Sequence, residues 1–225
     1  MQVAIVVFPG YTALDALGPY QVLAHTPGVD PVFVAERPGP VTDNRVLTIE
    51  ATAGLDDVPA PDAVLVAGGL AAITMARTGH PVVDWLRDVR PTAQWVTSVC
   101  TGALLLGAAG ILQGRRATTH WYAHDMLRDY GAVPVDERVV VDGDVVTAAG
   151  VSAGIDMALQ LAALWSDEPT AKMLQLDLEY APRPPFDCGS PATADPEITD
   201  HLRQMYDAVL ADLAAGGHDV SPDVP

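Results

Sequence analysis

The sequence predicts an α/β protein with a mostly parallel sheet and helices on both faces. Short valine-rich runs alternate along the chain with longer segments of helical periodicity, which is the pattern of βαβ units. Most of these runs are apolar at consecutive positions, as strands buried on both faces of a sheet require. At 225 residues and 49% hydrophobic composition, the chain can also bury a large core.

The strands are predicted from runs rich in β-branched residues. Four runs indicate buried strands: residues 3–8, 31–35, 62–67 and 95–99. Residues 46–50 alternate between apolar and polar, which is typical of a peripheral hairpin. Two valine runs at 139–141 and 145–147 flank Asp142-Gly143-Asp144, a strong hairpin signal.

The helices are predicted from periodic segments between these strands. They are residues 14–25, a stretch after Gly68-Gly69, a stretch after Cys100, and residues 81–89, 152–165, 169–178 and 197–213. Gly18-Pro19 should kink or restart the first of them. The last helix has an apolar face (Ile198, Leu202, Met205 and Leu210) and follows a proline-rich stretch. We expect one domain over residues 1–215 and a flexible tail over residues 216–225.

Charge and cysteine content restrict the partners and the compartment. The net charge of −17 and the absence of a basic stripe argue against nucleic acid or an anionic membrane as partner. The two cysteines, Cys100 and Cys188, lie in unlike settings and suit a reducing cytoplasm. No signal-peptide pattern and no apolar run of about 20 residues is present, so we expect a cytoplasmic protein.

Cys100 is the leading candidate for chemistry. It falls where a short buried strand turns directly into a helix of small and leucine residues, an arrangement similar to a nucleophile elbow. The positive end of the helix dipole should lower the thiol pKa and so favour a reactive thiolate. The alternative is a small buried core residue, the usual place of a cysteine.

Two other strand ends should converge on the same crevice, because ligands bind beyond the carboxyl ends of parallel strands. Asp15 is either a helix cap or a partly buried carboxylate that carries protons for the thiol. Gly68-Gly69 is either a plain tight turn or a loop whose amides bind an oxyanion.

The remaining motifs argue against cofactors. His120 and His124 are the only histidines expected near the site, and a histidine beside Trp121 is more often structural. No HExxH or clustered Cys/His spacing predicts a metal, no GxGxxG or P-loop predicts a nucleotide, and no GxSxG predicts serine chemistry. We therefore expect no metal and no cofactor.

Five segments together resemble the ThiJ/PfpI superfamily, and within it the isocyanide hydratases, over nearly the whole chain. They are residues 14–19, 67–69, 96–102, 116–121 and 178–182. The resemblance implies a flavodoxin-like sandwich, a homodimer, and catalytic roles for Cys100, Asp15 and Thr101. A peptidase-type member would have histidine where this chain has Thr101, and the loop after Gly69 lacks the threonine and glycines usual in the hydratases.

The activity implied by the resemblance is cofactor-free hydration of an organic isocyanide to an N-substituted formamide through a Cys100 thioimidate. Two alternatives remain open: a redox sensor in which Cys100 is oxidised without turnover, and a ligand-binding module. Regulators with a similar domain carry an additional DNA-binding region, for which this chain is too short and too acidic.

Overall fold

The computed structural model describes residues 1–216, which form a seven-stranded sheet of order β10-β11-β7-β6-β1-β2-β5. All neighbouring strands are parallel except the β10–β11 pair, so the predicted fold class is confirmed. The strands of this sheet are β1 (Gln2–Val6), β2 (Asp30–Ala35), β5 (Ala53–Gly54), β6 (Ala63–Val66), β7 (Trp95–Val99), β10 (Val139–Asp142) and β11 (Val145–Ala148). The predicted tail lies outside the described residues, apart from Gly216.

The centre of the sheet is buried as its sequence requires. Every residue of β6 and the last four of β1 are fully buried, because helices cover both faces of these strands. The two predicted hairpins are present and antiparallel, one as β10–β11 and the other as β3 (Gly39–Thr42) with β4 (Thr48–Ala51).

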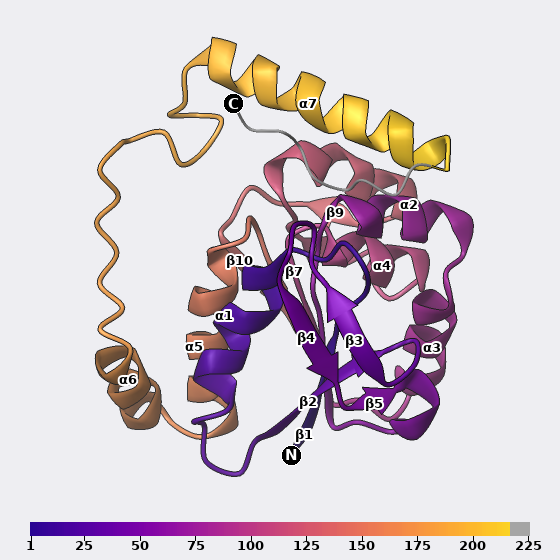
Figure 1. Cartoon of the computed structure of the whole chain (residues 1–225). Coiled ribbons are helices and arrows are strands. Elements are labelled where there is room, and N and C mark those ends of the chain that lie inside the picture. Colours follow the sequence, from indigo (N-terminus) through magenta and orange to yellow (C-terminus); the bar gives the residue numbers. More distant parts are fainter. Residues whose placement is uncertain (217–225) are drawn as a thin grey trace.

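Helices form the outer layers. Figure 1 shows α1 and α5 on one side of the sheet and α3 and α4 on the other, with α7 at the end of the molecule opposite the N-terminus. The helices are α1 (Ala13–Leu23), α2 (Leu70–Thr78), α3 (Pro81–Val89), α4 (Gly102–Ala108), α5 (Ala153–Trp165), α6 (Glu168–Asp177) and α7 (Pro196–Ala214). None of the helices in residues 1–216 is long and apolar enough to cross a bilayer.

The sequence predicted a kink or a restart of the first helix at Gly18-Pro19. The helix is not restarted there. α1 continues through both residues to Leu23. A β-carbon on Gly18 would lie 3.0 Å from Ile155 Cγ1, and one on Gly154 would lie 3.1 Å from Pro19 Cγ. The small residues therefore let α1 and α5 approach closely, and this packing holds the proline within the helix.

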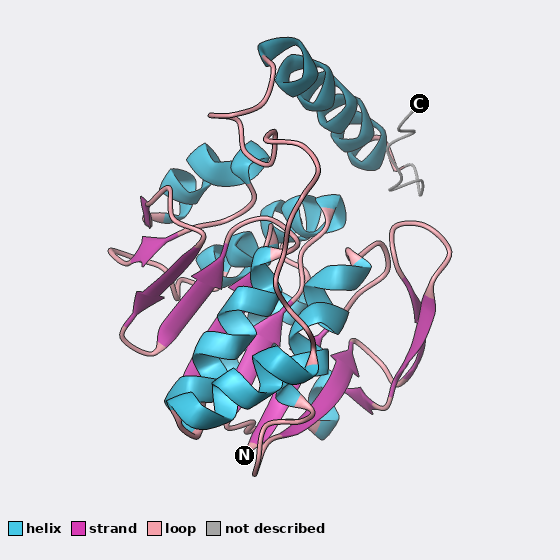
Figure 2. Cartoon of the chain, turned by 90° about the vertical axis from the view of Figure 1, so that its left-hand side faces the viewer, coloured by secondary structure: helices cyan, strands magenta, loops and turns pink. Residues whose placement is uncertain are grey.

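Three elements between α4 and β10 were not predicted. A 3₁₀ segment, η2 (Trp121–Tyr130), follows the short strand β8 (Arg116–Ala117), which pairs with β9 (Val133–Pro134). The final helix was predicted, and its expected apolar face is partly confirmed: Leu202, Met205 and Leu210 are half-buried, whereas Ile198 is 53% exposed. Figure 2 shows α7 lying apart from the sheet layers, joined to α6 by a long extended segment.

Candidate active site

Cys100 occupies the tight turn between β7 and α4, with a left-handed backbone (φ +55°) that is unusual for a residue other than glycine. Its amide N–H is shared between the carbonyls of Ala148 (3.1 Å) and Ala149 (2.9 Å). Its carbonyl accepts a hydrogen bond from Thr119 Oγ1 at 2.7 Å. These bonds hold a backbone conformation that costs about 1–2 kcal/mol. Cys100 is only 5% exposed to solvent.

Asp15 is fully buried in the first turn of α1 and does not cap that helix, whose N-cap is Thr12. Its Oδ2 accepts a hydrogen bond from the Gly68 amide at 2.9 Å. Its Oδ1 is buried and has no hydrogen-bond partner among residues 1–216. A carboxylate in the first helical turn usually accepts hydrogen bonds from amides of its own helix. Asp15 instead accepts one from Gly68, at the end of the neighbouring strand β6.

Gly68 is the point at which the candidate residues meet. A β-carbon there would lie 2.6 Å from Thr101 N, 2.7 Å from Asp15 Oδ2 and 2.8 Å from Cys100 Cβ. Real side chains do not tolerate such contacts. Only glycine therefore lets the strand ends of β6 and β7 and the start of α1 approach closely enough to bring the thiol and the carboxylate together.

Gly69 and Thr101 form a second link between the same two loops. The Gly69 amide donates to Thr101 Oγ1 at 2.8 Å, and the Thr101 hydroxyl donates to Gly69 O at 2.7 Å. Both amides of the Gly68-Gly69 pair are thus engaged with side chains, and their expected oxyanion-binding role stays a prediction. In this structure the pair positions Asp15 and Thr101.

The charge states of Asp15 and Cys100 are coupled. Burial raises the pKa of Asp15 to about 7, although the Gly68 amide and the contact with the Cys100 side chain act in the opposite direction. Burial and the charge of Asp15 raise the pKa of the Cys100 thiol, and hydrogen bonding with Thr101 opposes this rise only in part. The sequence prediction of a lowered thiol pKa is therefore wrong, because desolvation outweighs the helix end.

This order of pKa values defines what the pair can do. Near neutrality the carboxylate loses its proton before the thiol does, so the resting pair is a thiol beside a titrating carboxyl group. The carboxylate can then accept the thiol proton as the sulfur attacks an electrophile, which is general-base activation of a nucleophile.

His120 lies close to the turn but is not linked directly to the thiol by any hydrogen bond among the described residues. Its Nδ1 accepts the Tyr122 amide N–H at 3.4 Å and so begins η2, and burial lowers its pKa to about 4. The histidine is therefore neutral, and its capping contact fits the structural interpretation of the sequence.

An aromatic cluster surrounds His120, and the sequence interpretation did not include it. Tyr206 of α7 packs against His120, Trp121 and Tyr122, with ring centroids 5.9, 6.0 and 5.0 Å apart. The aromatic run 120–122 and the position of Tyr206 on the apolar face of α7 were visible signals. Nothing in the sequence showed that these distant segments meet, and the same holds for the bond from Thr119 to Cys100.

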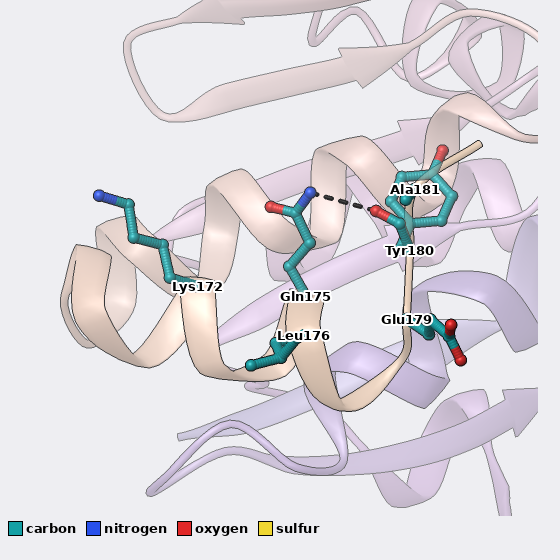
Figure 3. A pocket seen from close by; sticks show the side chains of 6 residues that line it. All are labelled: Lys172, Gln175, Leu176, Glu179, Tyr180 and Ala181. Carbon is teal, nitrogen blue, oxygen red and sulfur yellow. Dashed lines mark hydrogen bonds between the residues drawn. The ribbon is translucent and has the colours of Figure 1, made fainter. Parts of the chain in front are cut away.

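A separate pocket lies at the end of α6 and contains none of the candidate residues. Figure 3 shows its lining, which is Lys172, Gln175, Leu176, Glu179, Tyr180 and Ala181. Gln175 Nε2 donates to Tyr180 O across it at 3.2 Å. In Figure 1, α6 lies at the other end of the molecule from α7, so this pocket is not part of the Cys100 site.

Residues 1–216 contain no cluster of three or more His, Cys, Asp or Glu side chains that could hold a metal ion. Both cysteines are free thiols, Cys100 buried and Cys188 exposed.

The parallel sheet and the cysteine at its strand end belong to a known class of α/β proteins. Residues 1–164 match the model of the DJ-1/PfpI family, and the chain belongs to that family. The family resemblance found in the sequence is thereby confirmed.

Among curated proteins, the chain is 46% identical over 204 residues to the isonitrile (isocyanide) hydratase of Pseudomonas putida, a match that covers 91% of this chain and 89% of that protein. It is also 30% identical over 163 residues to the HTH-type transcriptional regulator CdhR of Pseudomonas aeruginosa, covering 64% of this chain but only 47% of the regulator.

Among solved structures, a THiJ/PfpI family protein from Pseudomonas syringae has a TM-score of 0.81 at 36% identity, covering 97% of this chain and 88% of that one. Drosophila melanogaster DJ-1beta has a TM-score of 0.72 at 21% identity, covering 80% and 98%. At this lower identity the likeness shows the fold alone.

Proposed function

We propose that residues 1–215 form one domain that hydrates an organic isocyanide, R–N≡C, to the formamide R–NH–CHO. The observation that carries the proposal is the buried pair of Cys100 and Asp15, brought together around Gly68. The 46% identity to an isonitrile hydratase over nine-tenths of the chain supports the choice of substrate.

The first half-reaction forms a bond between Cys100 Sγ and the terminal carbon of the isocyanide. As the sulfur attacks, the Asp15 carboxylate takes the thiol proton and then delivers it to that carbon. The product is a thioimidate, R–N=CH–S–Cys100. An acid with a pKa of about 7 suits both transfers, because it gains and loses a proton readily near neutrality.

The second half-reaction consumes water. Asp15 removes a proton from water as its oxygen attacks the thioimidate carbon, and the substrate nitrogen gains a proton. The tetrahedral adduct, R–NH–CH(OH)–S–Cys100, then collapses with cleavage of the carbon–sulfur bond. This releases the formamide and returns a proton to the thiol–carboxylate pair, so one difficult addition is divided into two easier ones.

Thr101 and the glycine pair keep this machinery in place. The amide of Thr101 lies at the base of α4, where its hydrogen bond lowers the pKa of the thiol and so favours the developing negative charge on sulfur. The Thr101 hydroxyl ties α4 to Gly69. Oxyanion binding by the amides of Gly68 and Gly69 would require their present hydrogen bonds to open.

The experiment is incubation with an isocyanide and detection of the formamide by mass spectrometry. Cys100→Ser should lose at least about 10³-fold in turnover, since a hydroxyl is a far weaker nucleophile than a thiolate. The matched control, Cys188→Ser, removes an exposed thiol and should leave turnover unchanged. EDTA should also leave it unchanged. No formamide from the wild type, or equal losses in both variants, would contradict the proposal in favour of a sensor or binding role.

We also propose that the protein acts as a homodimer in the cytoplasm, as the resemblance implies. Apolar side chains on α5 and α6 support a second copy as partner, since Leu164, Met173 and Leu176 are 53%, 64% and 79% exposed. A monomeric mass at micromolar concentration in light scattering would contradict the dimer.

A further inference from the structure

We propose that Tyr206, carried on α7, contacts the substituent R of the substrate and thereby selects which isocyanides reach Cys100. This inference rests on the proposed hydratase function and adds a specificity residue to it. It follows from the contacts that α7 makes, from the burial of the reacting groups and from the contrast between Tyr206 and its neighbour Tyr122.

The reacting groups are buried, whereas α7 lies at the surface of the molecule. Cys100 is 5% exposed and Asp15 is fully buried, so little of either reacting group is open to solvent. Figure 1 places α7 beyond the end of the sheet, opposite the N-terminus. No residue of α7 is fully buried, so fewer buried contacts hold this helix than hold the helices of the core.

α7 is attached to the 3₁₀ segment η2 through aromatic and polar contacts. Arg203 stacks over the Trp121 ring at 5.0 Å, and the Tyr122 hydroxyl donates to Asp207. Tyr206 lies between these two contacts and packs on three rings of η2 and its cap.

The base of this cluster adjoins the Cys100 turn. Thr119, which binds the Cys100 carbonyl, directly precedes His120. On its other side the His120 ring lies 3.5 Å from where a Gly150 β-carbon would stand, next to Ala149, which accepts the Cys100 N–H. The aromatic cluster therefore contacts the two segments that hydrogen-bond the Cys100 backbone, one at Thr119 and the other at Ala149.

Tyr206 is distinguished from Tyr122 by its surroundings. The Tyr122 hydroxyl is bound to Asp207, whose charge and hydrogen bond raise its pKa in addition to burial. The Tyr206 hydroxyl has no hydrogen-bond partner among residues 1–216, and the pKa of Tyr206 is raised by burial and, when the Cys100 thiol ionises, by its negative charge. The Tyr122 hydroxyl is thus engaged in the contact between η2 and α7, whereas the Tyr206 ring packs on His120, which follows Thr119 at the Cys100 turn.

The isocyano group is only two atoms long, so a substituent on its nitrogen must lie just outside the sulfur. A flat apolar group there would meet the Tyr206 ring, and such ring contacts contribute about 0.5–1.5 kcal/mol beyond area burial. Aryl isocyanides should therefore gain from Tyr206, whereas methyl isocyanide is too short to reach the ring.

The test compares kcat/KM for phenyl and methyl isocyanide in Tyr206→Ala, Tyr206→Phe and Tyr122→Phe. Tyr206→Ala should lower the phenyl-to-methyl ratio about 3- to 10-fold, and Tyr206→Phe should keep it, because the ring remains. Tyr122→Phe loosens α7 by removing its bond to Asp207 and should affect both substrates equally. An unchanged ratio in Tyr206→Ala would overturn the proposal, since general loosening of α7 acts on both substrates.

A second measurement separates this inference from the proposed function. In a Cys188→Ser background, the rate of Cys100 alkylation is compared between iodoacetamide and N-phenylmaleimide. Tyr206→Ala should change the ratio of the two rates at least threefold, and Tyr122→Phe should leave it unchanged. If the wild type produces no formamide but the ratio of alkylation rates shifts in Tyr206→Ala, the hydratase function is wrong and the position of Tyr206 beside Cys100 is supported. If the ratio does not shift, the place of Tyr206 is wrong.

Discussion

The amide of Gly68 donates a hydrogen bond to Asp15 Oδ2 at 2.9 Å across 53 residues of sequence. Through this bond the loop after β6 fixes a carboxylate in the first turn of α1. This bond leaves Oδ1 as the oxygen without a partner among residues 1–216. Asp15 therefore has one oxygen fixed by a backbone amide and one oxygen without a hydrogen-bond partner among these residues.

Gly68→Ala should disable the site. Its β-carbon would overlap Thr101 N, Asp15 Oδ2 and Cys100 Cβ, all within 2.8 Å. Overpacking of this kind typically costs about 1–3 kcal/mol in the free energy of unfolding. Turnover should fall by at least about 10²-fold, because a shift of 1 Å in the reacting groups is sufficient for such a loss.

The matched control is Gly189→Ala, at a glycine with no atom within 4 Å of its β-carbon position. Urea unfolding and formamide production should show no change in this variant. A Gly68→Ala protein with wild-type turnover would mean that the thiol and carboxylate need not be held as closely as the structure has them.

Thr119→Val should relax the turn that presents Cys100. The Thr119 hydroxyl holds the Cys100 carbonyl at 2.7 Å, and valine of similar shape would leave that carbonyl without this bond. We expect a loss of about 1–3 kcal/mol in chemical denaturation, together with lower turnover. Thr118→Val is the control, since Thr118 is similarly buried and its backbone amide, which valine keeps, donates to Thr147 Oγ1. Equal effects in both variants would refute a specific role for Thr119.

Cys100 should react slowly with iodoacetamide at pH 7, because burial and the charge of Asp15 raise its pKa. In a Cys188→Ser background, the alkylation rate should still be rising with pH at pH 9. Asp15→Asn removes the neighbouring negative charge and should move this rise to lower pH. Labelling at pH 7 as fast as that of free cysteine would instead support the low-pKa thiolate expected from the helix end alone.

The sequence was sufficient to predict the parallel sheet, because continuous apolar runs such as residues 3–8 have few alternatives to a buried strand. It was also sufficient to place Gly68 and Cys100 at the ends of neighbouring strands, with Asp15 at the start of the helix that follows the first strand. It was not sufficient for the thiol pKa, because the helix end is a local feature whereas desolvation depends on everything packed around the sulfur.

The cluster around Tyr206 shows the same limit. His120 and Tyr206 are far apart in sequence, and their contact depends on the path of the segment between α6 and α7. No periodicity in that segment specifies its path. Packing of α1 against α5 similarly overrode the local effect of Pro19, since the closeness of Gly18 to Ile155 could be known only from the folded chain.

Asp15→Asn provides the sharpest test of the acid–base role. A group whose pKa is raised in the folded state holds its proton where the unfolded chain has already lost it. For Asp15 this window runs from its ordinary value of 3.8 to about 7. In that range the native state binds more protons than the unfolded state, so its contribution to the free energy of unfolding falls as pH rises.

The stability of the wild type relative to Asp15→Asn should therefore decrease by roughly 4 kcal/mol between about pH 4 and pH 7, at about 1.36 kcal/mol per pKa unit. Urea unfolding of both proteins across this range measures the difference, and other titrating groups cancel in it. Turnover of the variant should fall by about 10²- to 10⁴-fold, the usual contribution of general acid–base catalysis, because an amide cannot exchange the proton. Asp15→Glu should be intermediate, since the carboxyl group is kept but moved by one methylene. A pH-independent difference in stability, together with more than half of the wild-type turnover in Asp15→Asn, would show that the buried carboxyl group neither titrates near neutrality nor carries the proton.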